Sequence, residues 1–225
     1  MHALFAQSEL SDLIDKVEKG ERLDFEAGVR MMASQDILAL GYMANLVRER
    51  KNGNNTYFIV RDPLDFKKVF AEHTNATMFY GKIERVEERI DYLLKLRVLQ
   101  DRIRGFLTFI PLPFDPKNTP YEETMGVGST TGFEDLKMLA ISRIILDNFD
   151  HVKAFWMMLG PKLAQVSLTF GVDDLDGTVV EDRMVNSVEA ERGQVMSKKA
   201  LIHLIQKARR DAVERDTLYR VLKTN

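Results

Sequence analysis

The chain has 225 residues and a mass of 25.9 kDa, and its 45% hydrophobic and 29% charged residues exclude a disordered or collagen-like protein. Its 32 Lys and Arg nearly balance its 34 Asp and Glu, so the chain lacks the positive charge that nucleic acid binding requires. It contains no cysteine, which excludes disulfides, thiolate nucleophiles and cysteine-bound iron–sulfur clusters. No apolar run approaches the ~20 residues of a membrane span, and the N-terminus lacks a signal-peptide pattern, so we expect a cytoplasmic protein without a membrane partner.

Residues 1–55 are expected to form an N-terminal helical segment. Apolar residues recur at helical spacing from Ser8 to Lys51. Ser34 and Asp36 can cap the start of the second helix, and Asn52-Gly53-Asn54 can end it.

Strand-like and helix-like segments alternate over residues 56–181. We expect strands at 56–60, 75–80, 106–111, 152–158 and 174–180, and helices at 64–70, 85–103, 133–148 and 161–170. Strands separated by helices of this length predict βαβ units and a parallel sheet. The segment is about half of the ~250 residues of a complete eight-stranded barrel, so the fold class is α/β with a partial (β/α) barrel of about five parallel strands.

The remaining segments are a loop within the barrel and a C-terminal extension. Residues 111–131 hold four of the six prolines, which predicts a long loop after the third strand. Thr131 is placed to cap the helix that follows this loop. Residues 182–225 are expected to form a helical extension, with a last helix at about 198–210 and a charged tail.

Short stretches along nearly the whole chain match one sequence pattern in the same order. They are Asp36–Gly41, Thr74–Gly81, Glu87–Arg89, Leu99–Asp101, Phe109–Leu112, Asn118-Thr119, Thr131–Phe133, His151–Trp156, Gly160–Gln165, Asp173–Glu181 and Glu214–Tyr219. In these stretches the chain resembles the aminofutalosine synthases, also called aminodeoxyfutalosine synthases, which are radical S-adenosylmethionine enzymes of the futalosine route to menaquinone. This resemblance implies a (β/α) barrel that binds a [4Fe-4S] cluster and S-adenosylmethionine. It also implies a transferase reaction, in which a 5′-deoxyadenosyl radical adds to a small-molecule substrate, a carboxyvinyloxy-benzoate.

The chain departs from the family after its first strand. Val60 is followed by Arg61-Asp62-Pro63, whereas family members carry a Cys-x3-Cys-x2-Cys cluster motif and three further strand–helix units there. We therefore expect an internally deleted form that holds no cluster and binds S-adenosylmethionine weakly or not at all. Lys82 also stands where the family pattern has a histidine, so an imidazole contact would be lost.

The resemblance assigns binding roles to six residues. Asp176, Thr178 and Tyr80 would contact S-adenosylmethionine, and Thr77, Trp156 and Glu181 would contact the substrate. Each residue also has a structural interpretation: Asp176-Gly177-Thr178 as a turn, Glu181 as a carboxylate in the first turn of a helix, and Tyr80, Thr77 and Trp156 as core residues. Trp156 is expected on the strand face that carries Val152 and Ala154, opposite His151 and Lys153. No catalytic residue is assigned, and the four histidines lack the spacing of a zinc site, so no metal site is expected.

Three functions remain open at this stage. The chain could be a descendant of aminofutalosine synthase without the radical reaction, a non-catalytic interaction or complementing subunit, or a truncated gene product. Removing three strands from a barrel leaves two exposed sheet edges, so we expect a homo-oligomer that forms through these edges.

Overall fold

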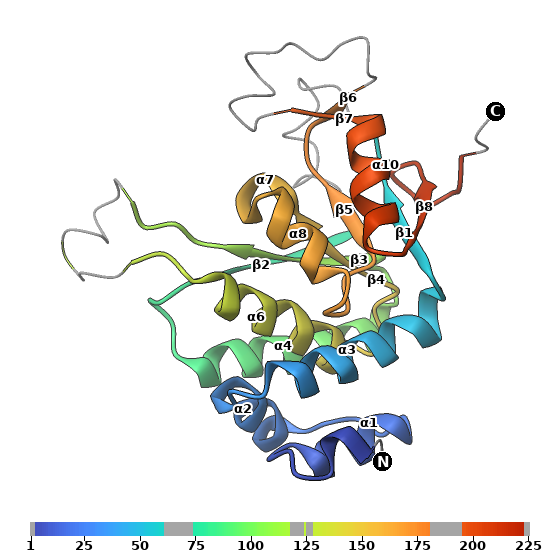
Figure 1. Ribbon diagram of the computed structural model, residues 1–225. Coiled ribbons are helices and arrows are strands. Elements are labelled where there is room, and N and C mark those ends of the chain that lie inside the picture. Colours follow the sequence, from blue (N-terminus) through green and yellow to red (C-terminus); the bar gives the residue numbers. More distant parts are fainter. Residues whose placement is uncertain (1–2, 61–73, 118–123, 125–127, 181–194, 223–225) are drawn as a thin grey trace.

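The core of the molecule is one six-stranded parallel sheet with helices packed against it (Figure 1). The structure is a computed structural model, and it describes residues 3–60, 74–117, 124, 128–180 and 195–222. In sheet order the strands are β2 (Asn75–Tyr80), β3 (Thr108–Pro113), β4 (His151–Phe155), β5 (Asp174–Asp176), β1 (Asn55–Phe58) and β8 (Asp211–Glu214). The expected α/β fold with a partial barrel of parallel strands is confirmed. The structure adds one strand to this sheet, β8, which lies in the segment expected to be a charged tail.

The first strand lies between the fifth strand and the last one. Tyr57 of β1 is in register with Asp174 of β5, and residues 55–58 pair in parallel with residues 211–214 of β8. In a closed (β/α) barrel the first and last barrel strands are neighbours, so the pairing of β1 with β5 keeps this closure contact. β8 pairs with the side of β1 that would pair with the second strand of a closed barrel.

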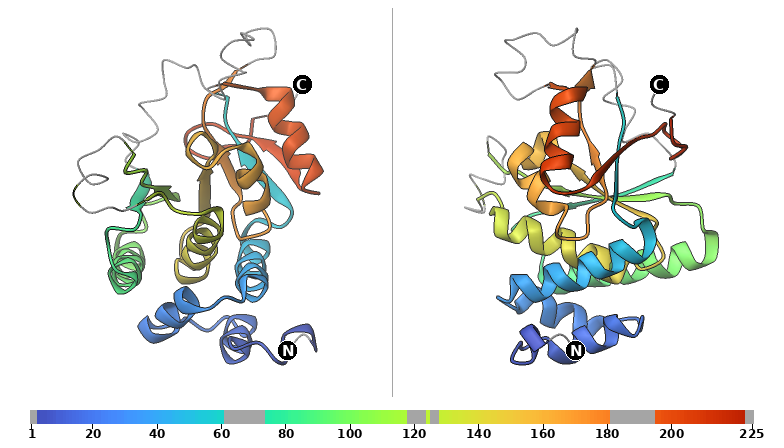
Figure 2. Two further views of the ribbon diagram at one scale, coloured as in Figure 1. Left: turned by 60° about the vertical axis from the view of Figure 1, so that its left-hand side comes forward. Right: turned by 45° about the vertical axis from the view of Figure 1, so that its right-hand side comes forward.

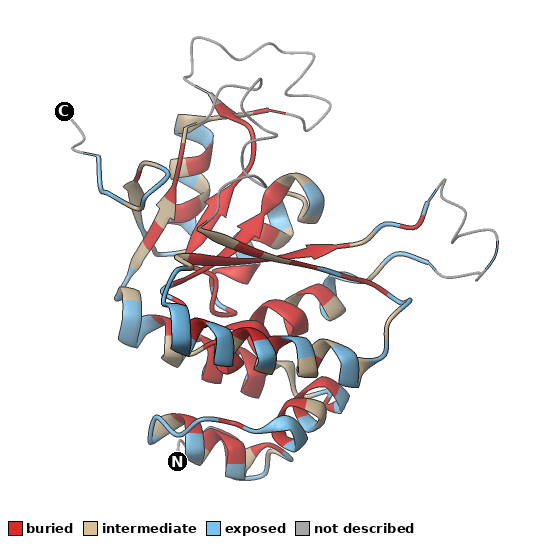
Figure 3. Ribbon diagram, turned by 180° about the vertical axis from the view of Figure 1, so that it is seen from behind, coloured by how far each residue is buried: buried red, intermediate tan, exposed pale blue. Residues whose placement is uncertain are grey.

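The main helices form a layer on the outer face of the sheet. They are α3 (Ile37–Asn52), α4 (Val86–Ile103), α6 (Gly132–Ile145), α8 (Pro161–Ser167) and α10 (Lys198–Lys207). Figure 2 shows α3, α4 and α6 side by side, and Figure 3 shows buried residues where the helices meet the sheet. Ala76, Met78 and Tyr80 of β2 share one core with residues of α4 and α6, which identifies the helix-facing side of that strand.

The N-terminal helices pack on the far side of this layer. A short 3-10 helix, η1 (Ala3–Phe5), precedes α1 (Ser11–Glu18) and α2 (Phe25–Ala33). Asp36 caps α3 as predicted, because its carboxylate accepts a hydrogen bond from Ala39 N at 3.0 Å. Thr131 caps α6 as predicted: its hydroxyl accepts a hydrogen bond from Glu134 N, and the Glu134 carboxylate accepts one from Thr131 N. Ser34 instead ends α2, and its hydroxyl accepts a hydrogen bond from Asp36 N.

Two of the predicted strands end earlier than the sequence suggested. The strand expected at 152–158 stops at Phe155, and α7 (Trp156–Leu159) follows at once, so Trp156 does not lie on a strand. The strand expected at 174–180 stops at Asp176, because Gly177 turns the chain with a φ of 156°. Beyond this turn β6 (Val179–Val180) pairs with β7 (Met196–Ser197) in a separate two-stranded sheet. The helix expected at 64–70 lies outside the described residues.

None of the helices in the described ranges combines the length and the apolar character that crossing a membrane would require.

Lys137 of α6 is buried without a carboxylate partner among the described residues. Its Nζ donates hydrogen bonds to the carbonyl oxygens of Met32, at 2.5 Å, and Ser34, at 2.7 Å. These groups lie at the C-terminal end of α2, where helical carbonyls lack intrahelical partners and the helix dipole favours a cation. Burial lowers the pKa of Lys137. The side chain therefore ties α6 to the end of α2.

We expect Lys137→Met to lower the free energy of unfolding by about 1–3 kcal/mol, because it leaves two carbonyl groups at a buried helix end without their donor. Urea denaturation measures this effect. Lys95→Met is the matched control, since the Lys95 side chain is 76% exposed. Equal stability of the two variants would show that Lys137 does not hold α2 in place.

Candidate functional site

The strands divide their side chains between two faces of the sheet. Val152 and Ala154 of β4 and Leu175 of β5 belong to the core formed with the outer helices. Side chains alternate along a strand, so the residues between them point to the opposite, inner face. This inner set consists of His151, Lys153 and Phe155 of β4 and Asp174 and Asp176 of β5.

Four charged side chains meet on the inner face, and we call them the inner-face ion cluster. Lys153 Nζ lies 2.7 Å from Asp176 Oδ2 and 3.8 Å from Asp174 Oδ2. Arg215 Nη2 lies 2.5 Å from Asp174 Oδ2 and 3.8 Å from Asp176 Oδ2. All four side chains are fully buried, and their charges cancel. Such a cluster is stable only while each charge keeps its partner, since an unpaired buried charge is costly.

Arg215 reaches the inner face from a hairpin that follows β8. This C-terminal hairpin, residues 215–222, is closed by hydrogen bonds from Asp216 N to Arg220 O at 3.0 Å and from Leu222 N to Glu214 O at 2.9 Å. Burial alone would lower the pKa of Arg215, but the attraction of Asp174 outweighs burial and raises the pKa above its usual value. The guanidinium therefore stays charged and holds the hairpin against the sheet.

Tyr219 is the second anchor of the C-terminal hairpin. Its ring stacks on His151 with centroids 3.8 Å apart and 5° between the planes, and Arg215 Cζ lies 4.0 Å from its centroid. The Tyr219 hydroxyl donates a short hydrogen bond to Asp174. Burial and Asp174 raise the pKa of Tyr219 well above its usual value, so it remains a donor. Tyr219 holds a left-handed backbone with a φ of 59°, which is uncommon outside glycine and is compensated here by these contacts.

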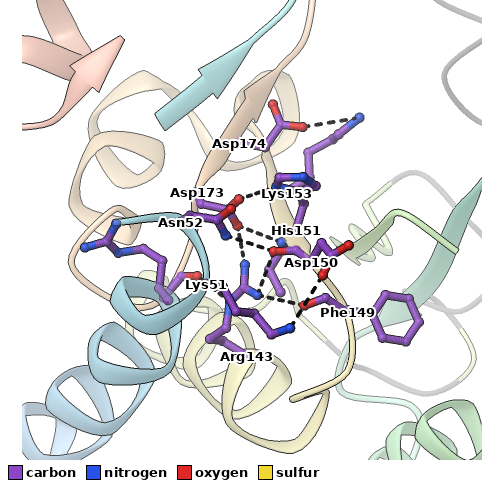
Figure 4. A network of polar contacts seen from close by, with 12 residues as sticks. Lys51, Asn52, Arg143, Phe149, Asp150, His151, Lys153, Asp173 and Asp174 are labelled. Carbon is purple, nitrogen blue, oxygen red and sulfur yellow. Dashed lines mark hydrogen bonds and ion pairs between the residues drawn. The ribbon is translucent and has the colours of Figure 1, made fainter. Parts of the chain in front are cut away.

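A second network ties the start of β4 and β5 to α6 (Figure 4). Asp173 accepts hydrogen bonds from Val152 N at 2.9 Å, from His151 Nδ1 at 2.5 Å and from the Arg143 guanidinium. Arg143 also donates to the carbonyl oxygens of Gly171, at 2.8 Å, and Phe149, at 3.2 Å. Burial alone would raise the pKa of Asp173, but Arg143 and His151 outweigh burial and hold the pKa below its usual value.

The structure separates the two site residues predicted on β2. Thr77 lies on the inner face, half-buried, whereas Tyr80 lies on the helix-facing side. The Tyr80 hydroxyl donates to Asp135 of α6 at 2.8 Å, and burial together with Asp135 raises the pKa of Tyr80 well above its usual value. Lys82 follows this strand, and its Nζ lies 3.8 Å from Glu134.

The predicted residues around the end of β5 are already in contact with other parts of the chain. Asp176 belongs to the inner-face ion cluster and also accepts a hydrogen bond from Gly177 N at 2.8 Å. The backbone N–H and the hydroxyl of Thr178 each donate to Met157 Sδ at 3.3 Å. Trp156 is buried in the core on the helix-facing side. Glu181 lies outside the described residues.

Sequence reasoning missed the residues that complete these networks. Arg215 and Tyr219 lie in the segment expected to be a charged tail, and Arg143 lies on a helix with no functional signal. The sequence did contain one indication of these partners: Asp174 and Asp176 alternate with Leu175 in a strand, so the two carboxylates lie on the same face. Two carboxylates on one buried strand face require nearby cations, and Lys153 in the apolar neighbouring strand is the obvious first one.

A [4Fe-4S] cluster does not fit the donor atoms of this chain. The cluster needs thiolate ligands, and the sequence contains no cysteine. Within the described ranges, no three histidine, aspartate or glutamate side chains are placed to hold a metal ion. Among the described residues, the inner face offers paired charges and hydrogen bonds.

The parallel sheet, its outer helices and its polar inner face define a partial (β/α) barrel. Residues 103–224, more than half of the chain, match the family described as the CofH/MqnC C-terminal region. The chain belongs to this family.

Two curated relatives match about two thirds of the chain. Aminodeoxyfutalosine synthase of Thermus thermophilus is 48% identical over 151 residues, which are 67% of this chain and 41% of that protein. The 5-amino-6-(D-ribitylamino)uracil–L-tyrosine 4-hydroxyphenyl transferase 2 of Methanosarcina barkeri is 42% identical over 151 residues, which are 65% of this chain and 39% of that protein. The resemblance to aminofutalosine synthase is thus confirmed, and the matched part spans about two fifths of each relative.

Solved structures support the fold. The FeFe-hydrogenase maturase HydG from Carboxydothermus hydrogenoformans superposes with a TM-score of 0.66 over 95% of this chain and 81% of that chain, at 11% identity. Another HydG structure gives a TM-score of 0.61 over 93% of this chain and 76% of that chain, at 8% identity. At these identities the likeness concerns the fold alone.

We expect Arg215→Met to lower the free energy of unfolding by about 3–5 kcal/mol, because it leaves two buried carboxylates with Lys153 as their one remaining partner in the cluster. Chemical denaturation measures the loss. Arg220→Met is the control from the same hairpin, since the Arg220 side chain is 75% exposed and pairs with Asp216 at the surface. A loss as small as that of the control would show that the cluster does not hold the hairpin.

The Asp173 carboxylate should make stability depend on pH. Its pKa is lower in the folded protein than in the unfolded chain, so its contribution is fully present above the unfolded value of about 3.9 and is lost as the pH falls through the folded value. Asp173→Asn should therefore be less stable than the parent at pH 7, and the difference should shrink below about pH 4. Urea denaturation at several pH values checks this, and a difference independent of pH would contradict it.

Proposed function

We propose that this chain is a non-catalytic member of its family, descended from aminofutalosine synthase, in which the partial barrel over residues 56–181 is kept and the radical reaction is lost. The observation that carries the proposal is the absence of cysteine from the whole sequence. Reductive cleavage of S-adenosylmethionine requires an iron–sulfur cluster, and thiolates are its usual ligands. The matched part of the chain also spans only 41% of the Thermus thermophilus aminodeoxyfutalosine synthase.

The contacts of the predicted cofactor residues support weak binding of S-adenosylmethionine. Asp176 is paired with Lys153 at 2.7 Å, and Thr178 is in contact with Met157, so a ligand would have to displace both partners. Tyr80 faces the helices and is bonded to Asp135. We therefore expect S-adenosylmethionine to bind no tighter than about millimolar.

Anaerobic reconstitution with iron and sulfide tests the loss of the reaction. We expect no charge-transfer absorbance of a bound cluster and no 5′-deoxyadenosine after addition of reductant and S-adenosylmethionine. The Thermus thermophilus relative, treated in parallel, is the control for the reconstitution itself. Cluster absorbance together with 5′-deoxyadenosine in the present chain would overturn the proposal.

A second candidate function is that of an interaction subunit, and the exposed edge of the sheet supports it. β2 ends the described sheet on one side, and its inner-face residue Phe79 is 62% exposed. The Tyr92 hydroxyl of α4 donates to Thr77 O at 2.9 Å, so one backbone carbonyl of this edge strand already has a hydrogen-bond partner within the chain. At the other edge the C-terminal hairpin pairs with the end of β8. The surface around Phe79 is thus the better place for a second copy or another partner.

We expect a homodimer or larger species at micromolar concentration, which light scattering coupled to size exclusion measures. Phe79→Asp should shift the population toward monomer, because it places a charge on the exposed apolar part of the edge strand. Leu38→Asp is the control, since Leu38 is 69% exposed on α3, in the helical layer rather than on the sheet. A sharp monomeric peak of the unaltered chain would contradict the expectation.

A further inference from the structure

One side of α4 carries apolar residues that the protein leaves exposed. Tyr92, Leu99 and Ile103 are 41%, 42% and 52% exposed. They follow one another at spacings of seven and four residues, so they lie on one face of the helix, in line with the core residue Leu96. A surface helix normally directs its apolar residues to the core, and an exposed apolar row indicates an interaction surface. We call this row the α4 stripe.

The α4 stripe lies beside the free edge of the sheet. Tyr92 donates a hydrogen bond to Thr77 O of β2, the strand that ends the described sheet. From the other side of the helix, Arg97 donates to Leu23 O and Ile145 O, so that side faces the start of α2 and the end of α6. Figure 2 shows α4 at the end of the row formed by α4, α6 and α3. The stripe is therefore on the uncovered side of this row, next to the edge strand.

The first half of α4 borders an acidic hollow. The hollow is lined by Phe25, Arg85, Glu87, Glu88 and Asp91. It contains three carboxylates and one guanidinium, and the Phe25 ring is half-exposed beside them. An aromatic ring among carboxylates fits the side chain of an arginine, which presents an apolar stem and a positive charge.

The second half of α4 carries the opposite charge. Lys95 and Arg102 are exposed and lie two turns apart on one side of the helix. Lys95 is paired with Asp91 of the same helix at 2.5 Å, whereas Arg102 has no ion-pair partner among the described residues. The exposed side of α4 is thus acidic toward its start and basic toward its end.

We propose that α4 is the interface of a symmetric dimer of this chain, in which the α4 helices of the two copies lie antiparallel. The Arg102 end of each helix then lies over the acidic hollow of the other, and the two stripes pack against each other. A parallel arrangement would set like charges and like helix ends side by side. This inference rests on the interaction function given above as the second candidate, and it identifies the partner as a second copy.

Sedimentation velocity of the full chain at micromolar concentrations tests the role of the stripe. Leu99→Asp places a charge in the middle of the stripe and should weaken the dimer by at least about tenfold. Val166→Asp is the matched control, since Val166 is 44% exposed but lies on α8. It should leave the dimer unchanged.

Charge reversal tests the orientation of the helices. Glu87→Lys with Asp91→Lys makes both halves of α4 basic, and this double variant should be monomeric where the unaltered chain is dimeric. Lys95→Glu with Arg102→Glu makes both halves acidic and should also be monomeric, but an equimolar mixture of the two double variants should form dimers. The variant with all four substitutions should dimerise with itself and form no mixed dimers with the unaltered chain, because a mixed antiparallel pair sets like charges together. Thermal melting of each variant confirms that it is folded.

Three results would overturn the inference, and they separate it from the interaction function. A dimer that Leu99→Asp and the double variants leave unchanged would show that copies associate elsewhere, so only the α4 interface would be wrong. Mixed dimers between the fourfold variant and the unaltered chain would show that the helices are parallel. A monomer at every concentration would overturn both the interface and the self-association on which it rests.

Discussion

The pairing of four buried charges on the inner face is the constraint on which the rest of the molecule depends. Leu175 must face the outer helices to complete their core, so Asp174 and Asp176 on either side of it must face inward. Two ionised carboxylates in this position need two cations. Lys153 comes from the neighbouring strand, but Arg215 comes from the C-terminal hairpin. A side chain near the C-terminus is therefore part of the buried inner face of the sheet.

Two consecutive aspartates connect the sheet to different partners. Asp173 bonds to Arg143 of α6, which joins the sheet to the helical layer, and Asp174 bonds to Arg215 of the C-terminal hairpin. His151 links these two networks, because its Nδ1 is bonded to Asp173 while its ring stacks on Tyr219. A substitution at one of these positions would therefore affect both the contacts with the helical layer and the contacts with the C-terminal hairpin, because residues in contact are energetically coupled.

Much of the fold could be predicted from local sequence. The caps at Asp36 and Thr131 and the apolar periods of the helices depend on neighbouring residues alone, and they were found where expected. The ends of β4 and β5 were missed for a local reason, since β-propensity continues through Trp156 and past Gly177 while the backbone turns away.

The partners of the site depend on distant segments, and this is why they were harder to predict. The parallel pairing of β8 with β1 joins segments that are far apart in the chain. Residues 211–214 of β8 include two charged side chains, and this is why the segment was expected to be a charged tail. Asp176 and Thr178 were identified as polar residues at the end of a strand. Nothing in the order of the residues revealed that Lys153 and Met157 would be their nearest partners. Such contacts follow from the register of the sheet, which is set by the whole core.

The place of β1 between β5 and β8 has a consequence for how the protein is made. β1 leaves the ribosome early, yet both of its partners lie near the other end of the chain. At usual rates of synthesis of about 5–20 residues per second, β1 waits roughly 10–30 s before β8 exists. During that time α1, α2 and α3 can form by local contacts, while one edge of β1 stays unpaired until β5 emerges and the other until β8 emerges. Chaperone demand in the cell should therefore concentrate on the growing chain before residues 211–214 emerge.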